Sequence, residues 1–358
     1  MRNTFGNHLT LTLFGESHGP EIGCVLDGLE PGLPVEEARI TELLRLRRPA
    51  GAISTARVEP DPFRIVSGVC DGRTTGAPLC ILIPNTQMRS GEYQNLSAAP
   101  RPGHADYPGY VKSNGYADLR GGGHFSGRLT AALTAAGAIV LPSLERRGIR
   151  IGTRIARCGG VPDRDFADLS ADLAALAQKP FPVLDETAAE AMRAAILAAA
   201  ADGDSVGGIL ETVATGLPAG LGEPWFDTVE GLLSHALFSI PAVKGVEFGN
   251  GFAFADLRGS QADDPFRMQD GAVVTEANHN GGALGGLTTG MPLRFRTVIK
   301  PTPTIARPRR TVDLRTGENV TVTVSGRHDP SIVPRAAIVQ TAVTALVLYD
   351  LLLGAGPR

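Results

Sequence analysis

The sequence predicts a mixed α and β fold built from two related halves. Segments with strand-like and helix-like apolar periodicity alternate along the chain. Turn motifs of the N-terminal half recur in the same order in the C-terminal half. Two apolar stretches, Leu129–Leu144 and Ala336–Leu353, fall short of the ~20 apolar residues of a membrane span, and Gln340 and Asp350 interrupt the second. We therefore expect both to be buried core helices.

The apolar pattern places the individual elements. Strands are predicted at Leu9–Phe14, Phe63–Val69, Leu79–Ile83, Ile149–Ala156, Ile209–Ala214, Val243–Phe248 and Leu293–Ile299. Helices are predicted at Val35–Arg48, from near Ser126 to Leu144, and at Asp168–Gln178, Glu186–Ala201 and Ala336–Leu353. No Ser-, Gly- or charge-rich linker divides the chain, so we expect one domain over residues 1–358.

Two pairs of turn motifs carry the internal repeat. The GLEPGLP motif at Gly28 is echoed by GLPAGLG at Gly216, and each precedes a helix-like segment. The GRTTGAPL motif at Gly72 is echoed by GLTTGMPL at Gly286, and each runs into a strand. Chance is the alternative, because Gly and Pro mark turns in unrelated proteins. The repeat predicts a pseudo-two-fold between halves at about residues 1–150 and 205–358.

Composition limits the class of partner. The net charge is -3, which gives no overall attraction to nucleic acid or to an anionic membrane, so an anion site must come from local arginine clusters. The four cysteines form no zinc-ligand spacing, and no metal is expected. The first residues contain no apolar run of signal-peptide length, so we expect a cytoplasmic protein.

Histidines stand in two glycine-containing turns. His18 follows a predicted strand and lies between Gly15 and Gly19, where a rigid backbone can hold a general acid in place. His104 lies two residues before Asp106, and an imidazole exchanges protons near neutral pH. For either histidine considered alone, a structural role is the alternative.

Residues 120–128 read RGGGHFSGR and precede a long predicted helix. Ser126 is a plausible helix cap, and backbone N–H groups at such a helix start bind anions. The GxxxxGK[ST] pattern of nucleotide hydrolases occurs nowhere in the chain. The run therefore indicates an anion site other than a P-loop.

Arginines and a Pro-rich segment add further candidate contacts. Arg47 and Arg48 end the first predicted helix, while Arg327 and Arg335 flank Asp329. Guanidinium groups match carboxylate and phosphate oxygens two at a time, although cations also favour helix C-termini for structural reasons. Proline makes the backbone of the KPTPTI segment at residues 300–305 rigid, which suits a phosphate-bearing cofactor.

Together these segments resemble the chorismate synthase family along essentially the whole chain. The resemblance is carried by Gly15–Gly19, Arg47–Pro49, Arg101–Asp106, Arg120–Gly123, Asp202–Gly207, Ala219–Pro224, Ala242–Glu247, Lys300–Thr302 and Gly326–Pro330. It implies an α+β sandwich with central helices between antiparallel sheets. It also implies a carbon-oxygen lyase of the shikimate pathway, which eliminates phosphate from 5-enolpyruvylshikimate 3-phosphate in an anti-1,4 sense to give chorismate.

The resemblance implies reduced FMN as cofactor, without net redox change, and it associates the family with NADP. An external flavin reductant and a homotetramer are implied as partners, with neither nucleic acid nor membrane. The catalytic roles carried over are His18 as proton donor to the departing phosphate, His104 as proton donor near the flavin N1, and Asp329 as helper of the flavin N5 in taking the ring proton.

The resemblance also carries over two sets of binding residues. The substrate contacts are Ser17, Arg47, Arg48, Arg128 and Arg327. The cofactor contacts are His124, Phe125, Ser126, Ala242, Gly285, Lys300, Pro301, Thr302, Pro303, Thr304 and Arg327.

The chain departs from the commoner family pattern after the glycine triplet, which is Arg-Ser-Ser-Ala-Arg-Glu-Thr. Here Ser126 and Arg128 are kept, and His124 is expected to replace the lost arginine as a donor. One alternative is a flavin oxidoreductase or phosphosugar lyase with the same anion site. Another is an RNA-binding protein that uses Arg307, Arg309 and Arg310, but the chain has few aromatic residues for base stacking.

Overall fold

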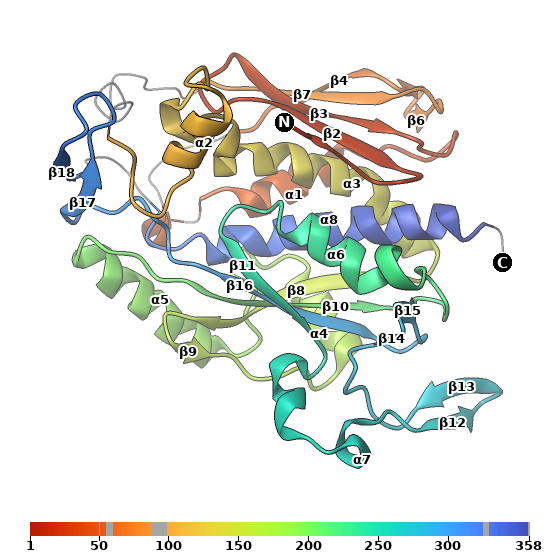
Figure 1. Ribbon diagram of the computed structural model, residues 1–358. Helices are drawn as coiled ribbons and strands as arrows, with labels where there is room; N and C mark the ends of the chain where they lie inside the picture. Colours follow the sequence, from red (N-terminus) through yellow and green to blue (C-terminus); the bar gives the residue numbers. More distant parts are fainter. Residues whose placement is uncertain (50, 55–59, 87–98, 325–328, 357–358) are drawn as a thin grey trace.

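Two antiparallel sheets enclose a layer of helices, which gives an α+β sandwich (Figure 1). The computed structural model describes residues 1–49, 51–54, 60–86, 99–324 and 329–356. The helices between the sheets are α1 (Glu37–Arg47), α3 (Thr130–Arg146), α6 (Val229–Leu237) and α8 (Val333–Gly354). The prediction of a mixed fold with central helices between antiparallel sheets is confirmed.

The first sheet has the strand order β1-β2-β3-β7-β4. Its strands are β1 (Thr4–Phe5), β2 (Thr10–Gly15), β3 (Glu21–Asp27), β7 (Leu79–Pro84) and β4 (Arg64–Ser67). The sequence pattern did not predict β3, because this central strand is buried almost throughout and lacks the usual alternation. A Cβ atom at its Gly23 would lie 2.5 Å from the Phe14 ring, so only glycine fits there.

The second sheet has the order β11-β16-β10-β8-β9. Its strands are β11 (Val243–Phe248), β16 (Leu293–Ile299), β10 (Gly208–Thr215), β8 (Arg150–Cys158) and β9 (Val161–Pro162). Each sheet therefore has a core of four strands in equivalent order, β2-β3-β7-β4 in one and β8-β10-β16-β11 in the other. In each half a helix follows the second of these strands along the chain, and a long helix follows the fourth.

The long helices α3 and α8 form the centre of the core. Both have the length and hydropathy of a membrane span, yet 89% and 83% of their apolar windows are buried inside the protein. The polar interruptions of α8 have partners: Gln340 donates to Thr212 Oγ1 at 2.8 Å and accepts from Thr297 Oγ1 at 2.5 Å. Asp350 accepts from the backbone N–H groups of residues 7–9. Both helices are buried core helices, as predicted.

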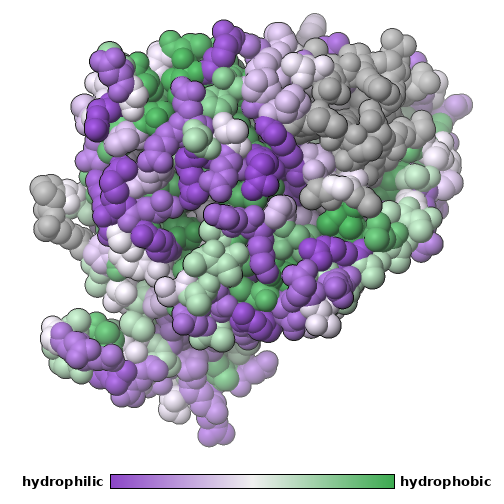
Figure 2. Space-filling model, turned by 180° about the vertical axis from the view of Figure 1, so that it is seen from behind, coloured by the Kyte–Doolittle hydropathy of each residue, from purple (hydrophilic) through white to green (hydrophobic). Residues whose placement is uncertain are grey.

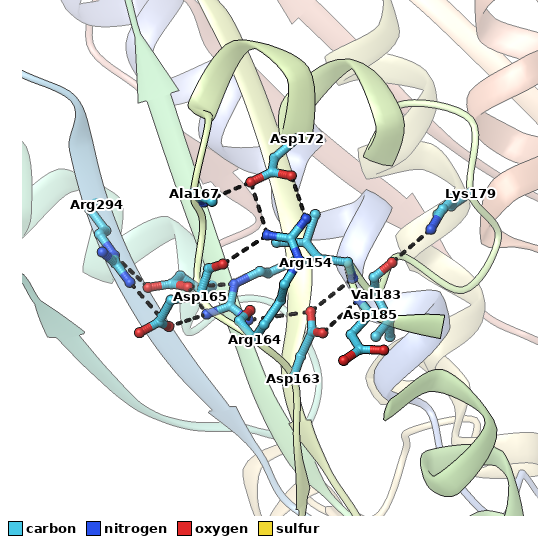
Figure 3. Close-up of polar contacts among 12 residues, drawn as sticks. Arg154, Asp163, Arg164, Asp165, Ala167, Asp172, Lys179, Val183, Asp185 and Arg294 are labelled. Carbon is cyan, nitrogen blue, oxygen red and sulfur yellow. Dashed lines mark hydrogen bonds and ion pairs between the residues drawn. The ribbon is translucent and has the colours of Figure 1, made fainter. Parts of the chain in front are cut away.

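A network of charges joins the second sheet to the segment that covers its outer face (Figure 3). Arg154 of β8 is 2% exposed and donates from Nε to Glu211 of β10 at 2.7 Å. Its guanidinium also contacts Asp163 and Asp165. Further along this segment, the Asp172 carboxylate accepts a fork of hydrogen bonds from Arg164.

The remaining elements lie outside the two large sheets and the four helices between them. They are the hairpins β5 (Val69–Cys70) with β6 (Arg73–Thr74), β12 (Phe266–Gln269) with β13 (Ala272–Thr275), β14 (Ala283–Leu284) with β15 (Leu287–Thr288), and β17 (Arg309–Val312) with β18 (Asn319–Val322), and the helices α2 (Asp106–Lys112), α4 (Leu169–Leu176), α5 (Glu186–Ala201) and α7 (Gly259–Ala262). The β12–β13 hairpin projects from the body of the molecule (Figure 1).

Candidate active site

A cavity of about 940 Å³ is lined by residues from both halves of the chain. Its volume lies within the range of ligand pockets, ~300–1,000 Å³. Two carboxylates, Asp61 and Asp329, face six cationic side chains in its wall: Arg2, Arg47, Arg101, Arg128, Lys300 and Arg335. This excess of positive charge suits a ligand that carries several negative charges.

The glycine triplet at residues 121–123 brings the two predicted histidines together. All three glycines have positive φ, at 59°, 92° and 53°, a conformation that other residues rarely adopt. A Cβ atom on Gly121 would lie 2.5 Å from Nε2 of His18, and one on Gly122 would lie 3.3 Å from Nε2 of His104. Both imidazoles therefore lie against adjacent residues of one turn, and both line the cavity.

His104 belongs to a charged cluster at the start of α2. Its Nδ1 lies 2.7 Å from Oδ1 of Asp106, and Arg101 donates to both oxygens of that carboxylate. Burial by itself would raise the pKa of Asp106, but the hydrogen bonds from Arg101 and His104 outweigh it and hold the pKa well below its usual range. Asp106 is therefore an ionised acceptor next to the ring.

Two arginines share one buried carboxylate in the cavity wall. Asp61 accepts from Arg47 at 2.7 Å through Oδ2 and contacts Arg128 through Oδ1. Arg47 is 1% exposed and Asp61 is 3% exposed, and Asp61 has a left-handed φ of 47° between two prolines. Arg128 also donates to Asn85 Oδ1 at 2.9 Å. Asp61 thus holds two guanidinium groups from separate parts of the chain at one place.

Asp329 occupies another part of the wall. Its Oδ1 accepts from Ser54 Oγ at 2.7 Å, and its Oδ2 accepts from Arg335 Nη1 at 2.6 Å. Arg335 donates from Nε to the backbone oxygen of Arg47 at 2.9 Å, which connects α8 to the end of α1. The carboxylate is consequently fixed in orientation at the cavity.

Lys300, Thr302, Pro303 and Thr304 also line the cavity, together with Ala242. Lys300 donates from Nζ to the Gly103 oxygen at 2.5 Å, and its backbone N–H donates to Ala242 at 2.9 Å. Thr302 Oγ1 is buried and has no hydrogen-bond partner among the described residues. A buried hydroxyl that has no partner within the protein is typical of a binding site whose ligand supplies the hydrogen bond.

Ser126 is a helix cap, as predicted: its Oγ accepts from the Arg128 N–H at 3.2 Å at the start of a short 3₁₀ turn that leads into α3. Phe125 and His124 also line the cavity. His124 already uses both ring nitrogens, Nδ1 with the Gly15 oxygen at 2.8 Å and Nε2 with Asn3 Oδ1 at 3.1 Å. In this arrangement a ligand contact from His124 would come from its ring carbons or its backbone.

Three predicted residues are not among those lining the described cavity. Arg48, which follows the last residue of α1 and has an extended backbone, donates instead to the backbone oxygen of Pro60. Pro301 is exposed, while Gly285 lies at the turn of the β14–β15 hairpin with no atom near its Cβ position. Arg327, the remaining predicted contact, lies outside the described residues.

Asp61, Asn85 and Arg101 are cavity residues that the sequence analysis did not single out as site residues. Asn85 donates to the backbone oxygens of Glu16 and Gly19, so it links the turn that carries His18 to Arg128. The Pro-Asp-Pro sequence around Asp61 marks a rigid turn and was the available signal. Arg101 is adjacent to the predicted His104 turn, but its fork on Asp106 was not visible from the spacing.

Comparison with known proteins agrees with this cavity. The family model of chorismate synthase matches residues 9–353 of the chain. A chorismate synthase of Pyrococcus abyssi is 48% identical over 348 residues, which cover 97% of this chain and 97% of that protein. The chain belongs to the chorismate synthase family. A second chorismate synthase, from Aeropyrum pernix, is 48% identical over 353 residues and is covered to 93% of its length.

A crystal structure of chorismate synthase has the same fold, with a TM-score of 0.74 and 30% sequence identity over 98% of this chain and 93% of that one. Membership in the chorismate synthase family gives the chain the lyase activity of that family, EC 4.2.3.5, in the shikimate pathway. The alternative of a flavin oxidoreductase or a phosphosugar lyase is therefore excluded.

Proposed function

We propose that the cavity binds 5-enolpyruvylshikimate 3-phosphate beside reduced FMN, and that phosphate is eliminated there in an anti-1,4 sense to give chorismate. The observation that carries the proposal is that the imidazoles of His18 and His104 lie against one glycine turn and line a cavity whose wall is rich in arginine. A substrate with one phosphate and two carboxylates needs several cations to replace its hydration shell.

The substrate contacts in this proposal come from side chains that already converge. Arg47 and Arg128 lie on either side of Asp61, and Ser17 lies next to His18. Guanidinium groups fixed before the ligand arrives lose little side-chain entropy on binding, so they favour a tight complex. Arg48 and Arg327 remain proposed contacts on the strength of the family resemblance alone.

Three side chains handle protons in the proposed reaction. His18, 8% exposed, donates a proton to the departing phosphate oxygen. His104, which lines the cavity, exchanges a proton at Nε2, the ring nitrogen that is not engaged by Asp106. Asp329, held by Ser54 and Arg335, offers a carboxylate oriented for the ring proton.

The chorismate synthase family uses reduced FMN, and the cavity wall fits such a group. We assign its contacts to Ser126, Ala242 and the segment 300–304. In that segment the buried Thr302 hydroxyl has no hydrogen-bond partner among the described residues. His124, Phe125, Gly285 and Arg327 complete the contacts carried over from the family. When bound, reduced FMN supplies electron density to the substrate ring and a basic N5. The chain's own residues orient it and exclude water.

The activity test uses the purified full chain, 5-enolpyruvylshikimate 3-phosphate and chemically reduced FMN without oxygen. Chorismate and phosphate are expected in equal amounts, and oxidised FMN is the control that should give neither. Release of phosphate without chorismate would falsify the proposed reaction.

His18→Ala is predicted to lower kcat by at least about 10²-fold, the usual contribution of a general acid, because the leaving phosphate loses its proton donor. FMN binding, followed by flavin fluorescence, should change little. His235→Ala serves as the matched control, since it removes another imidazole that lines the cavity and has no proposed role in binding or proton transfer. Loss of FMN binding and of thermal stability in His18→Ala would assign His18 to a structural role.

The proposal extends to the molecule and its surroundings. It places the enzyme in the cytoplasm, with reduced flavin supplied by an external reductant. It treats residues 1–358 as one domain whose halves are related by a pseudo-two-fold, which the matching strand orders support. It also includes a homotetramer, because large apolar side chains remain exposed on the single chain, among them Trp225 at 86% and Phe226 at 94%.

A further inference from the structure

The contact between His104 and Asp106 assigns the protonation of the ring. A carboxylate oxygen 2.7 Å from an unprotonated ring nitrogen would place two lone pairs against each other. Nδ1 of His104 therefore carries a proton and donates it to Asp106. Arg101 Nη2, at 3.2 Å from the same nitrogen, then finds no acceptor there, and its hydrogen bond goes to Asp106 instead.

Arg101 fixes the carboxylate that fixes the ring. Its Nε donates to Oδ2 of Asp106 at 2.7 Å, its Nη2 donates to Oδ1 at 2.8 Å, and its backbone N–H donates to Oδ2 at 3.0 Å. Asp106 is 4% exposed, so water does not compete for these bonds. These bonds fix the carboxylate in one orientation, and Nδ1–H of His104 is the remaining donor that contacts it.

We propose that Asp106, clamped by Arg101, is a positioning residue that holds His104 as the Nδ1–H tautomer and so presents Nε2 to the cavity. Nε2 is then the atom that takes up and returns the proton His104 exchanges. This inference rests on the proposed function, since it concerns the same histidine, but it is a statement about a ring nitrogen that can be tested without turnover.

An amide in place of the carboxylate reverses the tautomer. The nitrogen of Asp106→Asn cannot occupy the Oδ2 position, where two donors of Arg101 already point at it. At the Oδ1 position it meets Arg101 Nη2 and the imidazole. The imidazole can adapt by losing the Nδ1 proton and accepting from the amide, which moves its proton to Nε2. The ring would then face the cavity with a donor in place of an acceptor.

Asp172→Asn is a matched control. Asp172 also accepts two hydrogen bonds from one arginine, Arg164, and one from the backbone N–H of Ala167 (Figure 3). It has no histidine among these partners. Its substitution therefore reproduces the loss of two hydrogen bonds between an arginine and a carboxylate without affecting His104.

The experiment is solid-state nitrogen-15 NMR on the full chain labelled at histidine, with His104→Gln to assign the signal. The parent is expected to show Nδ1–H at His104, Asp106→Asn to show Nε2–H, and Asp172→Asn to match the parent. In the turnover assay, kcat of Asp106→Asn should fall about 10²-fold or more, as wrong-tautomer variants do, while KM stays within about threefold.

A parent His104 whose Nδ1 carries no proton overturns the proposal, and this outcome can be read from the parent even if Asp106→Asn does not fold. An unchanged His104 signal in folded Asp106→Asn overturns it as well, as does an altered His104 signal in Asp172→Asn. If the parent makes no chorismate while the NMR results are as expected, the proposed function fails and the positioning role of Asp106 survives.

Discussion

At the scale of single residues, the charge balance of the cavity depends on Asp61. Without it, Arg47 and Arg128 would place two guanidinium groups side by side in a buried wall, where their repulsion is weakly screened. The left-handed backbone at Asp61 has a conformational cost, and the two ion pairs offset it.

Asp61→Ala is predicted to lower the free energy of unfolding by about 3–5 kcal/mol, because it leaves the buried cation Arg47 without this carboxylate. Urea unfolding of the parent and variant measures the change. Glu21→Ala is the comparison: its pair with Arg64 is partly exposed and should contribute less than about 1 kcal/mol. Equal losses of unfolding free energy in the two variants would contradict the view that burial makes the Asp61 ion pairs more important than a surface pair.

A second residue-scale prediction concerns pH. The hydrogen bonds from Arg164 lower the pKa of Asp172 from its ordinary value of 3.8 to about 2. Since the pKa in the folded protein is depressed, the carboxylate contributes stability that is present above pH 3.8 and is lost as the pH falls towards 2.

The parent should therefore lose its stability advantage over Asp172→Asn across that interval. Urea unfolding of both proteins at neutral pH and at steps down to about pH 2 measures this, with Asp270→Asn, at an exposed turn, as the control. If the difference in free energy of unfolding between the parent and Asp172→Asn stays constant with pH, protonation of Asp172 is not coupled to unfolding.

At the scale of elements, α8 combines an apolar surface with a few polar residues that have specific partners. Asp350, 2% exposed, accepts from three consecutive backbone N–H groups before β2 and so ties the last helix to the first strands. Gln340 does the same towards the second sheet through Thr212 and Thr297. These bonds set the position of α8 along its axis, which apolar contacts alone would leave loosely defined.

Asp350→Ala should lower the free energy of unfolding by about 2 kcal/mol or more, since buried N–H donors would lose their acceptor. Asp350→Asn keeps an acceptor oxygen and should lose less. Chemical unfolding distinguishes the two variants. An alanine variant as stable as the parent would mean that water or another group satisfies these donors.

At the scale of the whole molecule, the projecting β12–β13 hairpin has no counterpart among the described residues of the first half (Figures 1 and 2). Its Phe266, Met268 and Val273 are 61–68% exposed, an unfavourable arrangement for a free monomer. Packing against a second copy of the chain would bury them, which accords with the proposed homotetramer.

The double variant Phe266→Ser with Met268→Ser is predicted to elute later than the parent in size-exclusion chromatography, because the assembly loses apolar contact area. Leu197→Ser, an exposed leucine on α5, is the control and should elute with the parent. An unchanged elution volume for the hairpin variant would place the subunit contacts elsewhere.

The sequence by itself determined the family and most of the strands of the two large sheets. Helix α5 and strands β11 and β16 have the predicted bounds, because their periodicity reports burial on one face. Strand β3, buried along nearly its whole length, gave no such alternation and was not predicted, and neither were the two-residue strands β1 and β9. The motifs around His18 and His104 likewise identified the cavity, since short Gly-rich turns encode their own backbone conformation.

Tertiary structure decided which side chains meet. The choice between the neighbours Arg47 and Arg48 depended on where α1 ends, and the partner of Arg47 and Arg128 lies in a separate turn. The orientation of His104 depended on the fork that Arg101 makes with Asp106. Local sequence encodes backbone torsions, whereas contacts between distant segments are fixed when the two sheets close on their helices, because only then are these charges removed from water.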